Sequence, residues 1–356
     1  MESAAQNSLQ LERIERLEDV REEWTRLAEA TEHPFATWDW NADWWRCFGP
    51  GRQLYSFACL DRAGDIVAIL PLYVAGTRPL RVARFLGYGD LHSPVCAPAD
   101  RALAARAMRE AMDRPGGCPL VVAERLPCEH GWGDLLGGRL LARQQNPVLR
   151  LAGMSWEDFL ASRSSNFRGQ VRRKERRLIE EQGLSFRLAD DTSRLADDLD
   201  TLFRLHALRW GKASTGVFEG DLGKFHREFA ASALHQGWLR LWFAEIGGEQ
   251  VAAWYGWRFA GAEWYWQAGR DTRWDDYSLG FVMLAHTVRE ACRDGVSAYH
   301  FLAGGDAYKG RFTQDDPEVE SRLLSSGPIA GLASVAVKIA DSLPASARQR
   351  VIRITN

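Results

Sequence analysis

The segment over residues 238–269 constrains the fold more than any other part of the sequence. It holds three runs rich in aromatic and β-branched residues, WLRLWFAEI, QVAAWYGWRF and EWYWQAG, separated by turns at Gly247-Gly248 and Ala260-Gly261. Such runs joined by glycine turns are typical of antiparallel strands that follow one another in a sheet. The sequence therefore predicts a three-stranded meander here.

A helix and another strand follow this meander. Ser278 is a candidate N-cap for a helix from about 279 to 293, whose apolar residues share one face, and 298–303 (AYHFLA) is a short strand with a buried character. A helix between two strands of one sheet is the crossover that makes neighbouring strands parallel. Two amphipathic helices, one ending at Trp210 and one over about 222–233, precede the meander.

The N-terminal half repeats this outline. Its strands are LYSFACL, IVAILPLYV and RVARFLG, followed by a helix over 100–114 and the strand CPLVVAE. The turns at Gly64 and Gly248 are 248 − 64 = 184 residues apart, and the helix starts at Asp100 and Ser278 are 278 − 100 = 178 apart. These similar offsets indicate a duplicated lobe. Pro71, inside the second run, predicts an edge position or a bulge.

Length and composition fit two globular domains of a reduced compartment. The 356 residues are too many for one typical domain, and the net charge of −2 provides no global field towards nucleic acid or anionic membranes. The N-terminus has no signal-peptide pattern, and no apolar run approaches the roughly 18 residues of a membrane span. The six cysteines show no zinc spacing. We expect a cytoplasmic protein with reduced, mostly buried thiols and no metal.

Several segments in order resemble a known family. SSNFRGQVRRKERRL, LFRLHALRWGK, EIGGEQVAAW, YSLGFVMLAHTVREACRDG and HFLAGGDAYKGRF, between about 155 and 315, resemble the CelD/BcsL (BioF2-like) acyltransferases of the GNAT superfamily. PFATWDW, AILPLY and LGYGDLHSP extend the resemblance to the N-terminal half. The plan is similar to that of Fem-type peptidoglycan transferases, which pair two GNAT lobes.

The resemblance implies an α/β (α+β) fold of tandem GNAT-like lobes, each a mixed, mostly antiparallel sheet flanked by helices. We assign residues 1–150 to an N-terminal lobe, 151–325 to the acyltransferase domain and 326–356 to a helical tail that docks on the body or lies on a membrane surface. The implied activity is acyl transfer, usually from acetyl-CoA and often in cellulose or other exopolysaccharide production.

The resemblance also places the donor at the start of the 279–293 helix, where backbone N–H groups face an anion. The family signature Q/R-x-x-G-x-G/A is reduced here to Gly280, with Asp275 and Asp276 close by. A plain capped helix or an aminoacyl-tRNA donor are the alternatives. The candidate donor-binding residues are Gly269, Tyr277, Ser278, Leu279 and Gly280.

Proton transfer is assigned first to the segment after the last strand. Asp306 is a candidate general base, Tyr308 a candidate acid for the departing thiolate, and Lys309 a candidate anchor for an anionic group. A polar turn that ends the strand is the alternative. His206 suits a base by its reference pKa, but it shares a face with Leu199 and Leu202 and is more often a core residue in such a place.

Candidate acceptor contacts come from two helices. Arg209 and Trp210 end the first of the two helices before the meander, where Trp210 either stacks on a sugar or packs in the core. Arg168 and Arg172 belong to a basic segment, 163–177, with seven Lys or Arg and one acid, which is either a solvated face or a phosphate-binding surface, tRNA included.

The main functional hypothesis is an acyltransferase that moves an acyl group from acyl-CoA to an amine or hydroxyl of a sugar or polysaccharide precursor or of a small metabolite. The alternatives are a Fem-like aminoacyl-tRNA-dependent transferase and a catalytically silent GNAT scaffold in exopolysaccharide synthesis.

Overall fold

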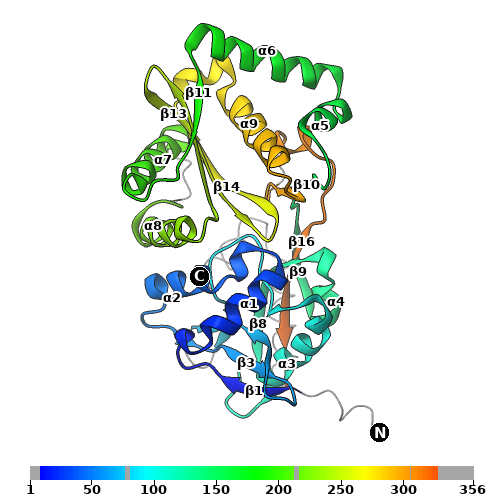
Figure 1. Cartoon of the computed structure of the whole chain (residues 1–356). Coiled ribbons are helices and arrows are strands. Elements are labelled where there is room, and N and C mark those ends of the chain that lie inside the picture. Colours follow the sequence, from blue (N-terminus) through cyan, green and yellow to red (C-terminus); the bar gives the residue numbers. More distant parts are fainter. Residues whose placement is uncertain (1–8, 77–80, 212–215, 305, 328–356) are drawn as a thin grey trace, which may run out of the picture. The chain divides into compact units, whose positions relative to one another are not determined.

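The computed structural model describes residues 9–76, 81–211, 216–304 and 306–327 (Figure 1). The chain divides into two compact units. Unit 2 is the continuous stretch 145–317, and unit 1 combines the chain up to 144 with the chain from 318 onward. Each unit has its own hydrophobic core. Unit 2 is described first because its meander is the strongest signal in the sequence.

Unit 2 contains one six-stranded sheet in the order β10-β15-β14-β13-β12-β11. All neighbours are antiparallel except β14 and β15, which are parallel. The predicted meander and the parallel final step are therefore confirmed. The strands are β10 (Val148–Arg150), β11 (Ser185–Leu188), β12 (Leu239–Ile246), β13 (Glu249–Phe259), β14 (Ala262–Arg270) and β15 (Ala298–His300).

Helices cover both faces of this sheet (Figure 1). The helices α7 (Leu195–Trp210) and α8 (Gly220–His235) pack on β12, β13 and β14, and α9 (Leu279–Arg293) packs on β13 and β14. The helices α5 (Trp156–Ser162) and α6 (Ser165–Gln182) pack on α9. The basic segment is thus the long helix α6, anchored by its apolar stripe of Phe167, Val171 and Leu178, which are all buried.

The start of α9 differs from the prediction in one respect. Ser278 occupies the N-cap position, but its side chain caps no backbone amide and its backbone is left-handed, with φ 57° and ψ 40°. Capping by a serine hydroxyl requires extended backbone at that residue, so the predicted cap is wrong. The Ser278 hydroxyl instead accepts a hydrogen bond of 2.7 Å from the Lys174 ammonium of α6.

Unit 1 repeats the element order of unit 2 with a divided sheet. The chain runs through β1 (Gln10–Arg13), α1 (Arg21–Thr31) and α2 (Trp38–Phe48) to the strand pairs. One sheet has the order β1-β3-β4-β7, and the other has the order β2-β5-β6-β8-β16-β9. As in unit 2, a helix, α3 (Arg101–Asp113), connects two parallel strands, β6 and β8. The remaining strands are β2 (Gln53–Leu54), β3 (Phe57–Leu60), β4 (Ile66–Leu70), β5 (Leu72–Ala75), β6 (Val82–Phe85), β7 (Val95–Cys96), β8 (Leu120–Pro127), β9 (Arg139–Gln144) and β16 (Val319–Ser325).

Pro71 marks the point where unit 1 changes sheets. It separates β4, which pairs with β3, from β5, which pairs with β2 and β6. Proline has no N–H for a strand ladder, and this residue interrupts the run at the switch. The expected irregularity is therefore a bend that passes the chain from one sheet to the other.

The position of β16 shows that the expected boundary of the acyltransferase domain at 325 is wrong. The sequence interpretation placed residues up to 325 in the acyltransferase domain, whereas β16 pairs with β8 and β9 in unit 1. Such long-range pairing leaves no local sequence signal. The expected helical tail over 326–356 lies outside the described residues except for 326 and 327. Among the described helices, none is both long and apolar enough to cross a bilayer. None of the six cysteines, all of which lie in the described part of the chain, forms a disulfide, and four are buried.

Candidate active site

A cavity of about 400 Å³ lies in unit 2, between the carboxyl end of β14, the start of α9 and the chain after β15. Its inner wall is apolar and comes from β13, β14 and α9, with Trp254, Met283 and Leu284 among its residues. Of the candidate site residues, the cavity brings together Arg209, Gly269, Ser278, Gly280 and Tyr308.

The edge of β14 is open where it borders this cavity. Parallel pairing with β15 runs only from Ala262↔Ala298 to Trp264↔His300, while β14 continues to Arg270. The Asp271 amide donates to Val251 of the meander over 2.8 Å. Because backbone groups alternate sides along a strand, those of Ala268 and Arg270 face away from β13, towards the open edge. Their N–H groups are donors aimed at the cavity side of the sheet.

Gly269 allows α7 to approach this edge closely. A Cβ at Gly269 would lie 2.3 Å from the His206 amide nitrogen and 2.4 Å from the Leu205 carbonyl carbon. Both neighbours are backbone atoms of a helix, so they cannot move aside as a side-chain end can. The absence of a side chain at Gly269 thus sets the distance between α7 and β14.

The start of α9 presents backbone donors to the same cavity. The amides of Leu279 and Gly280 have no partner within the helix, whereas the Phe281 amide already donates to the Ser278 carbonyl at 3.0 Å. The left-handed Ser278 followed by helical Leu279 forms a concave turn of the kind that binds anions. Gly280 lines the cavity and keeps the turn accessible. Asp275, which the sequence suggested would oppose an anion, is paired with Arg270 at 2.6 Å.

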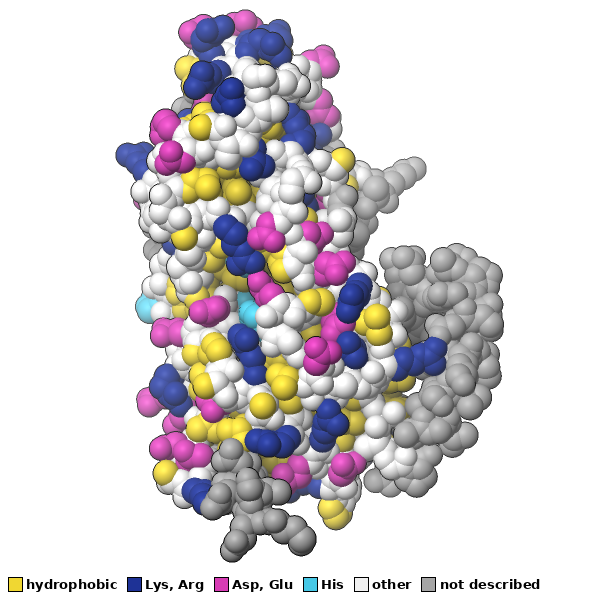
Figure 2. Space-filling view, turned by 90° about the vertical axis from the view of Figure 1, so that its right-hand side faces the viewer, with side chains coloured by type: hydrophobic (Ala, Val, Ile, Leu, Met, Phe, Trp, Pro, Cys, Tyr) yellow, Lys and Arg dark blue, Asp and Glu magenta, His cyan; other side chains and the backbone are white. Residues whose placement is uncertain are grey.

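Cations surround this helix start. The ammonium of Lys174 contacts the Ser278 hydroxyl, and the guanidinium of Arg311 lies 4.3 Å from the Phe281 ring centre. Partial burial, with Arg311 and Arg173 nearby, lowers the pKa of Lys174. Figure 2 shows Lys and Arg side chains at the top of the view, where Figure 1 places α6, with acidic side chains beside them. The helix start therefore suits an anionic ligand.

Tyr308 and Tyr265 form a hydroxyl pair beside the open edge. Both line the cavity, and Tyr265 stacks on Trp254 at 5.4 Å between ring centres. Burial raises the pKa of Tyr308, and the nearby Tyr265, to which it is hydrogen-bonded, raises it further. Tyr308 therefore keeps its proton at neutral pH, so its hydroxyl can donate a hydrogen bond into the cavity.

His206 lies in the core behind the sheet rather than in the cavity wall. It is 4% exposed, and its ring contacts the Phe218 ring edge-on at 4.9 Å between centres. Burial lowers its pKa to about 4 against a hydrogen bond with Gln267 that acts in the other direction. The geometry favours its packing role, while its backbone shapes the cavity through Gly269.

The side chain of Lys309 is buried and forms hydrogen bonds within the protein. Its ammonium donates to the carbonyls of Leu302, Ala303 and Gly304, each at 3.1 Å, and only 4% of the residue is exposed. Three carbonyls match its three protons, so the residue fixes the loop after β15 instead of an anionic substrate. Asp306 pairs with it at 3.5 Å, is half-exposed and does not line the cavity.

The remaining candidates lie around the cavity rather than in its wall. The Arg168 guanidinium donates to the carbonyls of Arg163 and Ala161, which end α5, and Arg172 is exposed. Trp210 is 38% exposed beneath the Arg209 guanidinium, 4.6 Å from the ring centre. Tyr277 hydrogen-bonds to Gln182, and Leu279 is buried in the core.

Sequence reasoning missed several residues of the site. Tyr265, Arg270 and Arg311 line the cavity but were not among the candidates. Lys174, which contacts Ser278, was expected only as part of the basic segment over 163–177. Arg311 follows the Asp306–Lys309 motif so closely that the motif could have been extended to it. Nothing local marks Tyr265, because its exposure to the cavity depends on where β15 stops.

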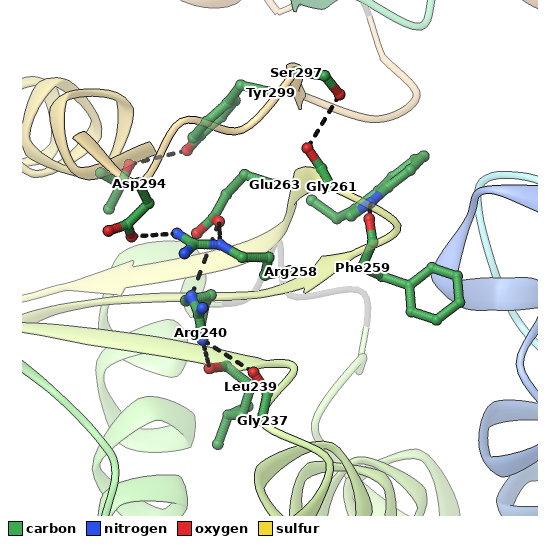
Figure 3. Close-up of polar contacts among 12 residues, drawn as sticks. Gly237, Leu239, Arg240, Arg258, Phe259, Gly261, Glu263, Asp294, Ser297 and Tyr299 are labelled. Atoms are coloured by element: carbon green, nitrogen blue, oxygen red, sulfur yellow. Dashed lines mark hydrogen bonds and ion pairs between the residues drawn. The ribbon is translucent and has the colours of Figure 1, made fainter. Parts of the chain in front are cut away.

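A second cluster of charges lies at the opposite end of β14 (Figure 3). Glu263 is 1% exposed and accepts a hydrogen bond of 3.0 Å from Arg258, which also reaches Asp294 at 2.6 Å. Arg240 lies 3.9 Å from the same carboxylate. Burial raises the pKa of Glu263 to about 7, against the opposing effect of the two arginines. This cluster joins β12, β13 and α9 to β14.

Comparison with protein families now identifies the domain. Residues 165–310 match the family model described as the acetyltransferase (GNAT) domain. Unit 2 therefore carries a GNAT-type acetyltransferase domain. The matched region holds the open edge of β14, the start of α9 and Tyr308. No curated protein matches the chain.

Solved structures share this fold over most of the chain at low identity. FemX has a TM-score of 0.59 and 10% identity, covering 89% of this chain and 95% of its own. The C-terminal domain (DUF2156) of a protein assigned as a lysylphosphatidylglycerol synthetase from Agrobacterium fabrum has a TM-score of 0.56 and 13% identity, covering 91% and 97%. L-PGS from Bacillus licheniformis has a TM-score of 0.53 and 12% identity, covering 83% and 94%. These likenesses describe the fold alone.

In the described part of the chain, no group of three His, Cys, Asp or Glu side chains could hold a metal ion.

Proposed function

We propose that the protein is an acyltransferase that moves an acyl group from acyl-CoA, most simply acetyl-CoA, to an amine or hydroxyl. The observation that carries this proposal is one cavity bordered by both the open edge of β14 and the start of α9. A thioester donor with a diphosphate needs these two features together: donors for its carbonyl oxygen and an anion site at a fixed distance from them.

Different groups of the cavity stabilise the thioester oxygen, protonate the departing thiolate and hold the diphosphate. The amides of Ala268 and Arg270 stabilise the negative charge that develops on the thioester oxygen when the acceptor attacks the carbonyl carbon. As the carbon–sulfur bond breaks, Tyr308 gives its proton to the departing thiolate. The acceptor's proton leaves to solvent, since His206 lies outside the cavity wall, and the Tyr308 phenolate regains a proton from solvent before the next turnover. The start of α9, with Lys174 and Arg311 beside it, holds the diphosphate.

The acceptor is proposed as a sugar or polysaccharide precursor or a small metabolite. An exposed tryptophan with an arginine over its ring, as at Trp210 and Arg209, is a surface on which a sugar ring stacks. Arg209 also lines the cavity and donates to the Ala268 carbonyl at 3.3 Å. An acceptor on this surface would thus lie next to the open edge. The cytoplasmic location expected from the sequence remains part of the proposal.

A second candidate is the aminoacyl-tRNA-dependent transfer implied by the Fem resemblance. It is favoured by Arg172 and Arg173, which are exposed on α6 near the donor site. The fold shared with FemX and with L-PGS is compatible with it. A long anionic donor would follow α6 away from the cavity, and its affinity would fall steeply with salt.

Calorimetric titration with acetyl-CoA tests the first candidate. We expect micromolar binding with one site per chain. The Gly280→Glu variant should bind at least tenfold more weakly, because it places a carboxylate at the anion site. Gly280→Ala is the matched control and should bind like the unchanged protein, since the three atoms nearest to a Cβ there all belong to the flexible Arg270 side chain, the first at 3.4 Å.

Absence of binding by any acyl-CoA would reject the first candidate. Salt-sensitive binding of aminoacyl-tRNA by the same sample would then support the second. Binding of neither donor would leave a silent scaffold as the remaining hypothesis.

A further inference from the structure

A second groove, of about 580 Å³, adjoins the donor cavity on the α6 side. Its walls are the end of α5, the start of α6 and residues 310–314. Arg311 lines both this groove and the donor cavity, so the two spaces meet at its side chain. We call this space the α6 groove. The acyltransferase proposal makes no use of it.

The charge of the α6 groove is one-sided. Two arginines, Arg163 and Arg311, line it, and none of the described residues in its walls is acidic. The other side chains that face it are mainly uncharged hydrogen-bonding groups such as Asn166, Gln170 and Gln314. Such a lining suits a ligand that carries both negative charge and hydroxyl or amine groups.

Arg163 is held rigidly with part of its guanidinium available. Its Nη1 donates to the Phe312 carbonyl at 2.9 Å and its Nε to the Ser162 hydroxyl at 3.1 Å. In the described part of the chain no carboxylate pairs with it. Five N–H donors less the two used leave three, in a fork that matches a phosphate. Fixing the side chain in advance lowers the entropy cost of binding.

Arg311 connects the groove to the start of α9. Its Nη2 donates to the Gln170 amide oxygen at 2.7 Å, and its guanidinium lies over the Phe281 ring at 4.3 Å and the Phe167 ring at 5.7 Å. A donor whose diphosphate rests on Gly280 therefore meets Arg311 next, and the α6 groove beyond it.

We propose that the α6 groove binds the phosphorylated nucleoside end of the donor, with its phosphomonoester at Arg163. This inference rests on the proposed acyl-CoA donor and names the part of the donor that the groove recognises. In acyl-CoA that end is an adenosine with a 3′-phosphate, which supplies the negative charge and the polar groups that the lining suits. The groove then selects donors by an end far from the reacting acyl group.

The test compares acetyl-CoA with acetyl-dephospho-CoA, which lacks the 3′-phosphate, by calorimetric titration of the full chain. For the unchanged protein we expect acetyl-CoA to bind about tenfold more tightly, the effect of one charge-assisted contact near the surface. In Arg163→Gln this ratio should fall to about one, because only the phosphorylated donor loses a partner.

Two further variants separate recognition from folding and from general charge. Asn166→Asp keeps the oxygen that accepts from Gln170 at 3.1 Å and puts an acid in the first turn of α6, which favours the helix, yet its charge should also reduce the ratio. Arg176→Gln removes an exposed charge of the same helix outside the groove and the donor cavity, and it should leave the ratio near ten.

An unchanged ratio in both Arg163→Gln and Asn166→Asp would overturn the inference while leaving the proposed function intact. Equal affinity of the unchanged protein for the two donors would do the same. If neither donor binds, the proposed function itself fails, and the inference fails with it.

Discussion

Both units contain one pair of parallel strands, but the two units differ in which strand of the pair is longer. In unit 2 the strand before the helix is the long one: β14 continues from 265 to 270 after its pairing with β15 has ended. In unit 1 the first strand of the parallel pair is the short one: β6 pairs through Arg84↔Val122 and ends at Phe85, while β8 runs on to Pro127. The short strand β7 also lies between β6 and α3 in the chain. Only unit 2 thus has a first strand with a long unpaired edge beside its partner.

The helices between the paired strands, α9 in unit 2 and α3 in unit 1, also differ at their starts. α9 begins with a left-handed Ser278 and an accessible Gly280, whereas α3 is preceded by Pro98 and by Asp100, whose carboxylate disfavours an anion. The comparison teaches that a shared topology gives no donor site by itself. The site requires an overhanging strand and a helix start whose nearby acid is neutralised, as Asp275 is by Arg270.

The largest effect is expected at the contact between α7 and β14. Gly269→Ala places a Cβ against the backbone of Leu205 and His206, so α7 must move away from the sheet. We expect the free energy of unfolding to fall by about 3 kcal/mol, at the upper end for overpacking, together with loss of donor binding. Thermal unfolding and titration with acetyl-CoA measure the two effects.

Gly169→Ala provides the matched control for that substitution. Gly169 lies within α6, and no heavy atom beyond its own chain neighbours and helix backbone comes within 4 Å of the new Cβ. This variant should gain up to about 1 kcal/mol from helix propensity. Equal stability of the two alanine variants would show that the close contact does not shape unit 2.

The next effect concerns the hydroxyl beside the open edge. Tyr308→Phe should lower the rate of thiol release from acetyl-CoA about 100-fold, the range for loss of a general acid, with little change in donor affinity. The rate follows from a thiol-trapping assay and the affinity from calorimetry. A parallel loss of affinity would instead indicate that Tyr308 shapes the cavity rather than donates a proton.

The sequence predicted the elements that depend on neighbouring residues, and it did not predict contacts between distant parts of the chain. The meander and α9 were predictable because aromatic runs, glycine turns and helical spacing are local patterns. The assignment of β16 to unit 1 was not, since its partners β8 and β9 lie more than 170 residues earlier in the chain.

The candidate site also contains residues that local motifs predicted and residues that only the fold brings together. Ser278, Gly280 and Tyr308 were found from motifs and line the cavity. The motif around Lys309 also predicted a substrate contact, but the buried ammonium binds three carbonyls, which only the folded loop brings together. The sequence marked Lys174 only as part of the basic segment, because its contact with Ser278 arises from the packing of α6 on α9.

A smaller effect should appear in the pH dependence of stability. The parallel step of unit 2 contains buried Glu263, whereas that of unit 1 contains buried Arg84, paired with Glu124 at 2.8 Å. Because burial raises the pKa of Glu263 to about 7, the folded state binds a proton that the unfolded state has released above its ordinary pKa. Its contribution is therefore complete below about pH 4.5 and is lost as the pH rises through 7.

Glu263→Gln removes this proton uptake. Between pH 6 and pH 8 the free energy of unfolding should fall by about 1 kcal/mol less in the variant than in the unchanged protein. Urea unfolding at the two pH values measures the difference. Identical slopes would mean that Arg258 and Arg240 keep Glu263 ionised throughout this range.

The smallest effect is expected at the helix start of unit 1. Asp100→Asn removes the carboxylate before α3, and because the Asp100 side chain caps no backbone amide, the helix should be preserved. If removal of this unneutralised acid were sufficient for donor binding, titration with acetyl-CoA would reveal a second site per chain. We expect one site with an affinity within twofold of the unchanged protein, because β6 still ends one residue after its last pairing and exposes no overhanging amides. A second site would show that the acid alone distinguishes the two units and that the strand overhang is dispensable.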